Sequence, residues 1–160
     1  MNEQIDIKQM LKDIPLEQFN GAICPQETLN IDENQINALY KDAYDLYEDN
    51  QFTESRERFS ELVTLNPWNT TYWMGLAASL HLEVQLEPAL QAYAVAGLLN
   101  DKDPHPHFYA AQCLTSLNQP EEAKKALNEA FVRSNGHYEY LSLMQRIRIM
   151  QNQLEGNSPL

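Results

Sequence analysis

Three residues are the conspicuous candidates for catalysis or metal binding: His105, His107 and Cys113. Cys113 follows His107 by six residues, which places the two side chains on different sides of a helix and argues against a thiolate–imidazole pair. A metal site needs more ligands than these residues supply. The acidic residues follow the solvated faces of predicted helices and form no paired-carboxylate site. We therefore predict that the protein is not an enzyme and has no catalytic residues, cofactor or metal.

A second group of residues has the chemistry of a binding surface. Tyr40, Tyr44 and Tyr47 are spaced by four and then three residues, which gathers their rings within about 60° of one another on a helix. The packing residues of the same helix, from Leu39 to Leu46, form a neighbouring stripe. Tyrosine offers a large contact area, few rotatable bonds and a hydroxyl that can bond a peptide backbone. The alternative is that these rings belong to the core, with Tyr40 beneath the N-terminal helix and Tyr47 against the turn.

Length and composition limit the class of protein. The chain has 160 residues, 43% hydrophobic residues and a formal net charge of −12. It is long enough for one domain or one short repeat array. It has no basic patch for nucleic acid. The opening "MNEQIDIKQMLKDIP" lacks the features of a signal peptide, and "WMGLAASL" is too short to span a bilayer. We expect no direct membrane insertion, and free thiols at Cys24 and Cys113 in a reducing cytoplasm.

The element that positions the tyrosines is a repeat of 34 residues. Small and aromatic residues recur at this spacing: Ala77 and Ala111, Ala89 and Ala123, and Phe59 and Tyr93. Two helices can approach closely where the side chains between them are small. The pattern resembles the tetratricopeptide repeat, a helix–turn–helix unit that stacks on its neighbours.

The sequence therefore predicts an all-α fold built from three tetratricopeptide repeats, a helix-turn-helix solenoid with a helix before it and a helix after it. The expected segments are an N-terminal helix and loop at 1–29, repeats within 30–135 (36–69, 70–103 and 104–135), a C-terminal capping helix at 136–154 and a frayed tail at 155–160.

Local chemistry predicts where the helices begin and end. The segment "NID" at 30–32 supplies capping side chains for the first long helix. Asn50 is a turn residue, Thr53 is expected to cap the next helix, and Pro67 ends it. Pro120 falls in a first turn, where a missing N–H does no harm.

The first helix of each tetratricopeptide pair lines the concave surface of the stack. The predicted peptide-binding residues on these helices are Asn37, Tyr40, Tyr44, Tyr47, Met74, Ala78, His81, Phe108 and Gln112. Their rings, one methionine and neutral polar groups suit an extended peptide with apolar side chains.

Several short motifs narrow the resemblance. They are "LYxxAY" at Leu39–Tyr44, Gly75-Leu76-Ala77-Ala78, Gln91-Ala92-Tyr93, Leu98-Leu99-Asn100-Asp101 and Ala110-Ala111-Gln112-Cys113. Over roughly residues 28–135 the chain resembles the class II chaperones of bacterial type III secretion systems. The loop "NGAICPQETLN" departs from the glycine-glycine-threonine-leucine-like run of that family, which bears on the geometry of any dimer.

The resemblance implies a bacterial cytoplasmic chaperone that holds hydrophobic translocator proteins before export. It implies that a short segment containing proline and leucine lies extended in the groove, and that the chain can form a homodimer through its N-terminal region. The sequence has no G-x-x-x-x-G-K-[ST] loop, so we expect the chaperone to act without ATP.

Two other binding functions are alternatives to this one. A clamp for an acidic C-terminus needs lysine, asparagine and arginine in the groove, whereas this chain has Tyr40, Tyr44 and Met74 there. A generic tetratricopeptide interaction scaffold in another pathway is the alternative that the sequence leaves open.

Overall fold

The structure is a computed structural model that describes residues 30–156. The predicted N-terminal helix and loop, Cys24 and the last four residues lie outside this range. The described helices are α3 (Glu33–Glu48), α4 (Phe52–Leu65), α5 (Thr70–Leu82), α6 (Leu86–Leu99), α7 (His105–Ser116), α8 (Pro120–Ser134), the 3-10 turn η2 (Tyr138–Tyr140) and α9 (Leu141–Leu154).

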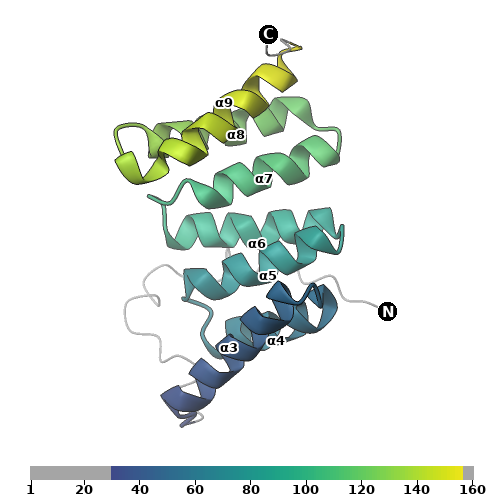
Figure 1. The fold of residues 1–160 in the computed structure, drawn as a ribbon, viewed down its shortest axis with the longest axis vertical. Coiled ribbons are helices and arrows are strands. Elements are labelled where there is room, and N and C mark those ends of the chain that lie inside the picture. Colours follow the sequence, from purple (N-terminus) through teal and green to yellow (C-terminus); the bar gives the residue numbers. More distant parts are fainter. Residues whose placement is uncertain (1–29, 157–160) are drawn as a thin grey trace, which may run out of the picture.

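The helices stack in chain order, and each packs against the next (Figure 1). α3 pairs with α4, α5 with α6 and α7 with α8, while α9 packs on α8 at the far end of the stack. The all-α, tetratricopeptide-like fold that the repeat predicts is confirmed. No helix among residues 30–156 combines the length and the hydropathy needed to cross a membrane.

Small residues at the helix crossings explain this packing. Ala43, Ala77 and Ala111 lie at equivalent positions of the first helices, and each is completely buried. Ala89 and Ala123 are completely buried on the second helices. Because a larger side chain at such a crossing would push the helices apart, the spacing of these alanines in the sequence determines how the helices pair.

A glycine in α5 allows the closest contact between the first two repeats. A Cβ atom placed on Gly75 would lie 2.2 Å from Cε1 of Phe59, whose ring is 3% exposed. The ring of Phe59 therefore lies directly against the α5 backbone, an arrangement that only glycine permits at this position.

The helix ends follow local chemistry with one exception. Asp32 caps α3, and the side chain of Gln35 accepts the backbone N–H of Asp32 at 3.1 Å, which completes a capping box. α4 ends before Pro67 and α8 begins at Pro120, as predicted. The prediction for Thr53 is wrong: it lies inside α4, and its hydroxyl donates to the Glu83 carboxylate at 2.7 Å.

The tight turns within the three pairs place one residue each in the left-handed region. Asn50 has φ 59° and Asn118 has φ 58°, whereas the equivalent residue of the second pair, Val84, has φ 61°. Asparagine adopts this conformation readily, but a β-branched residue is strained there. Val84 is 74% exposed, so no packing offsets that strain.

Val84→Asn is therefore expected to stabilise the protein by about 1 kcal/mol, which raises the midpoint of thermal unfolding by about 2–4 °C. The measurement is thermal unfolding followed by circular dichroism. The matched change, Asn118→Val, should lower the midpoint by a similar amount. An unchanged or lower midpoint for Val84→Asn would show that the turn carries no such strain.

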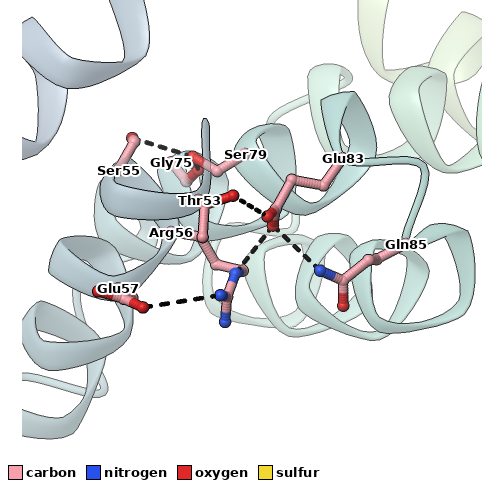
Figure 2. A network of polar contacts seen from close by, with 8 residues as sticks. All are labelled: Thr53, Ser55, Arg56, Glu57, Gly75, Ser79, Glu83 and Gln85. Atoms are coloured by element: carbon pink, nitrogen blue, oxygen red, sulfur yellow. Dashed lines mark hydrogen bonds and ion pairs between the residues drawn. The ribbon is translucent and has the colours of Figure 1, made fainter. Parts of the chain in front are cut away.

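Polar side chains connect the first repeat to the second (Figure 2). The Glu83 carboxylate, at the end of α5, accepts the Thr53 hydroxyl and lies 2.8 Å from Nε of Arg56. The buried hydroxyls of Ser55 and Ser79 lie 3.1 Å apart. These contacts fix α4 against α5 and so hold the concave helices α3 and α5 in register.

Candidate peptide-binding groove

Two adjoining cavities lie along the first helices of the repeats. One has a volume of about 330 Å³ and is lined by Tyr47, Met74, Ala78, His81, Leu82, Tyr93, Tyr109 and Gln112. The other has a volume of about 660 Å³ and is lined by His81, Phe108, Gln112, Thr115, Ser116, Arg146, Ile149, Met150, Gln153 and Leu154. Because His81 and Gln112 line both, the cavities adjoin, and together they are called the groove below.

Most of the predicted binding residues lie around this groove. The structure brings together Tyr47, Met74, Ala78, His81, Phe108 and Gln112. Asn37, Tyr40 and Tyr44 are not among the lining residues and lie on α3, towards the first end of the stack. The structure thus places six of the nine residues side by side, and their role in binding stays a prediction.

The three tyrosines of α3 differ in their surroundings. Tyr40 packs against the core of the first repeat, with its ring centroid 6.1 Å from that of Phe59 and 5.8 Å from that of Tyr72. It is therefore partly a packing residue, the alternative that the sequence left open. Tyr44 is 50% exposed, and the Glu48 carboxylate raises the pKa of its hydroxyl. It offers a neutral ring to a ligand without disturbing the core.

Tyr47 faces both the turn and the groove. Its ring makes an edge contact with Phe52 at a centroid distance of 5.6 Å, and the residue is half-buried. Burial raises the pKa of its hydroxyl, so that the group stays neutral at physiological pH. A neutral hydroxyl at the edge of a cavity can donate to a carbonyl of a bound chain.

Two aromatic residues that line the groove, Tyr93 and Tyr109, were not predicted as binding residues. Tyr93 comes from α6 and fits the packing position of the repeat, but its side chain also reaches the smaller cavity. Its hydroxyl lies 3.4 Å from Nδ1 of His81, and its ring stacks on Tyr109 at 5.6 Å. Burial raises the pKa of Tyr93 and lowers that of His81, so both are neutral at pH 7.

The helix α9 also contributes to the groove. It was expected only to cap the stack, and Leu143 and Ile147 do pack into the last core cluster. The neighbouring face of α9 lines the larger cavity through Arg146, Ile149, Met150, Gln153 and Leu154. A helical wheel of α9 would have shown that these lining residues form a second face beside the one that packs into the core.

The groove is almost free of formal charge. At neutral pH the only charged side chain among its lining residues is Arg146. The chain as a whole has 23 acidic and 11 basic residues, so its charge lies outside this surface. A neutral lining of rings, aliphatic groups, amides and hydroxyls can bury apolar side chains and bond a peptide backbone at the same time.

The residues considered for catalysis, Cys113 and His105 among them, have structural surroundings and form no catalytic arrangement. Cys113 is completely buried as a free thiol, and burial raises its pKa to about 11, which suppresses its nucleophilicity. His105 pairs with Asp103, with Nδ1 2.7 Å from the carboxylate. Within residues 30–156, no group of three or more His, Cys, Asp and Glu side chains is arranged to hold a metal ion.

These features define a tetratricopeptide-type protein with an open groove along the first helices of its repeats, in which Arg146 is the one charged lining residue. Comparisons with known proteins show a related group. The chain is 32% identical over 95 residues to the chaperone protein SicA of Salmonella typhimurium, a match that covers 59% of this chain. It covers 58% of SicA, so the chain spans little more than half the length of that relative. No family model matches the chain.

Solved structures extend the likeness. A chain of the CopN–Scc3 complex is 35% identical, with a TM-score of 0.81, and the match covers 92% of this chain and 86% of that one. The type III secretion chaperone SycD of Yersinia enterocolitica, bound to a peptide of the translocator YopD, shares the fold at 23% identity. Its TM-score is 0.76, with 78% of this chain and 95% of that chain covered.

The chain belongs to the class II chaperones of type III secretion systems. SicA is named as a chaperone, and membership confirms the prediction that this protein is not an enzyme. It also confirms the resemblance drawn from the motifs between residues 39 and 113.

Proposed function

We propose that the protein is an ATP-independent chaperone of the bacterial cytoplasm that holds hydrophobic translocator proteins of a type III secretion system. An extended apolar segment of the translocator lies along the concave side. The observation that carries this proposal is the neutral groove, which runs from Tyr47 on α3 across α5 and α7 to α9.

The shape of the groove favours an extended occupant. Its lining comes from the first helices of successive repeats, from Tyr93 of α6 and from α9, so a ligand must cross several helices to fill it. His81 and Gln112 line both cavities, so one continuous segment can occupy the two in succession. The YopD peptide bound to SycD is the precedent among proteins of this fold.

The distribution of charge fits the same task. A translocator exposes apolar segments that aggregate in water, and a neutral groove can cover one of them. The excess of acidic residues elsewhere on the chain keeps the complex soluble.

The proposed binding set is the nine residues predicted from the sequence, with Tyr93, Tyr109 and the α9 face added from the groove. Residues 30–135 form the three repeats of the proposed division, 136–154 the final helix, and 1–29 the region through which a homodimer forms. A structure of SycD described as a dimer supports an assembly of this kind for the family.

Co-purification tests the function. The full chain, co-expressed with the translocator proteins encoded near its gene, is expected to keep at least one of them soluble and to co-purify with it. Recovery of soluble hydrophilic partners alone would contradict the proposal and favour the interaction scaffold.

Tyr44→Ala is expected to weaken the complex about 5- to 10-fold, because an aromatic ring at an interface contributes on the order of 1 kcal/mol. Its 50% exposure means that the fold should not change. Tyr138→Ala is the control, because Tyr138 is 87% exposed and lies in η2, away from the three tyrosines of α3. Equal binding by both variants would remove Tyr44 from the site. The measurement is the dissociation constant, with circular dichroism as the check on folding.

A further inference from the structure

Arg146 is a cation without a counter-charge at the wall of the groove. It lies on α9, is exposed and lines the larger cavity. Its guanidinium carbon lies 4.6 Å from the ring centroid of Phe108 and 5.9 Å from that of Tyr109. Among residues 30–156 it forms no ion pair and donates no hydrogen bond.

Three of the other four arginines of the chain pair with a carboxylate, and the fourth, Arg148, lies outside the groove lining. Arg56 lies 2.8 Å from the Glu83 carboxylate, Arg58 donates to Asp42 at 2.8 Å, and Arg133 pairs with Glu129. In a chain where acidic residues outnumber basic ones by 23 to 11, a guanidinium that faces a cavity without a carboxylate is an exception.

The contact with the rings holds this cation in place without neutralising it. A cation–π interaction uses the positive charge but none of the five N–H donors of the guanidinium group. The donors stay available for a ligand, and a planar guanidinium matches a carboxylate through two parallel hydrogen bonds. The surroundings of Arg146 therefore select for an anionic group in whatever occupies the larger cavity.

We propose that Arg146 binds an acidic side chain, aspartate or glutamate, of the segment held in the groove. This inference rests on the proposed function and specifies one position of its ligand. Charge complementarity supports it, because Arg146 is the single charged residue among the groove lining. Outside the groove the acidic residues outnumber the basic ones, so an acidic side chain of a ligand meets more like charge than opposite charge there.

The carboxylate belongs to a side chain and not to a chain end. The lining of the larger cavity continues beyond Arg146 to Gln153 and Leu154, two turns further along α9. In the other direction it continues to His81, where the smaller cavity begins. A segment that fills the groove therefore passes Arg146 and does not end there, and the amides of Gln112 and Gln153 can bond its backbone.

The probe is the translocator segment that the chain protects from proteolysis, synthesised with an acetylated N-terminus and an amidated C-terminus. Each Asp or Glu in it is replaced in turn by Asn or Gln, and the dissociation constants are measured for the wild-type chain and for Arg146→Gln. One replacement should weaken binding to the wild-type chain about 5- to 10-fold and leave binding to Arg146→Gln unchanged.

Arg148→Gln is the matched control. Arg148 lies on the same helix, stacks over Phe131 at 6.0 Å and is not part of the groove lining. The Arg148→Gln variant should distinguish acidic from neutral peptides as the wild-type chain does. Arg146→Glu should reverse the preference and bind the peptide with lysine at that position more tightly, which keeps the test informative if Arg146→Gln loses helicity.

Three results would overturn the inference. They are a protected segment without acidic residues, a charge effect that persists in Arg146→Gln, and a peptide that gains affinity only when its C-terminal carboxylate is free. In each case the peptide still binds, so the proposed function stands. If no translocator segment is protected at all, the proposed function fails instead.

Discussion

Ala78→Trp is expected to abolish binding of the translocator segment while the helical stack stays folded. Ala78 lies on α5, is partly exposed and lines the smaller cavity, whose volume is about 330 Å³. An indole at this position occupies the space that an apolar side chain of the ligand would fill. The expected loss of affinity is at least about 100-fold, or roughly 2.7 kcal/mol. The measurement is a binding isotherm with the synthetic segment, alongside circular dichroism.

The neighbouring residue provides the contrast. Ala77 is completely buried at the crossing of helices, so Ala77→Trp should unfold the repeats and lose helicity. The two variants add the same indole one position apart and should fail in different ways. Normal binding by Ala78→Trp would show that the ligand lies elsewhere, and a folded Ala77→Trp would contradict the packing of the repeats.

Gly75→Ala is expected to destabilise the protein by about 2 kcal/mol, although alanine is the better helix former. Helix propensity alone would favour the change by about 1 kcal/mol. The added methyl group, however, would lie 2.2 Å from Cε1 of Phe59, a buried ring that cannot move towards solvent without opening the core. The midpoint of thermal unfolding should fall by about 4–8 °C.

Gly97→Ala serves as the control for this change. Gly97 lies within α6, and a Cβ atom there would be 3.4 Å from Nε2 of His107, an ordinary contact. Its helix propensity should therefore dominate, and the protein should be as stable as the wild type or slightly more stable. If Gly75→Ala also stabilises the chain, the close approach of Phe59 to α5 is not a feature of the protein in solution.

The fold was predictable because its determinants are steric and periodic. The fully buried Ala77 and Ala111 recur at 34 residues in the sequence, and so do Ala89 and Ala123. Small residues at fixed spacing leave few ways for helices to pair. The wrong prediction for Thr53 has the opposite cause. Its hydroxyl bonds Glu83, which is 30 residues away, and no local pattern reports a contact of that range.

The site was predictable only in part, since a groove depends on more than the face of one helix. Met74, Ala78 and Gln112 were found because the repeat fixes which face of α5 and α7 is concave. Tyr40 was predicted to lie on the same surface, but its ring packs against Phe59 of α4 and Tyr72 of α5, and helical spacing alone does not report how deeply these neighbours bury it. The helix α9 follows the last repeat, so the 34-residue spacing could not predict which of its residues line the groove.

The polar contacts between α4 and α5 affect the order in which the helices of the stack unfold. In repeat proteins the terminal units fray first, because each has one neighbour instead of two. Here Ser55, Ser79 and the Glu83 carboxylate fasten the first pair of helices to the second, and some of these groups are buried (Figure 2). At the opposite end, α9 rests mainly on α8. Local unfolding should therefore start at α9, and a bound segment would dissociate first from that end of the groove.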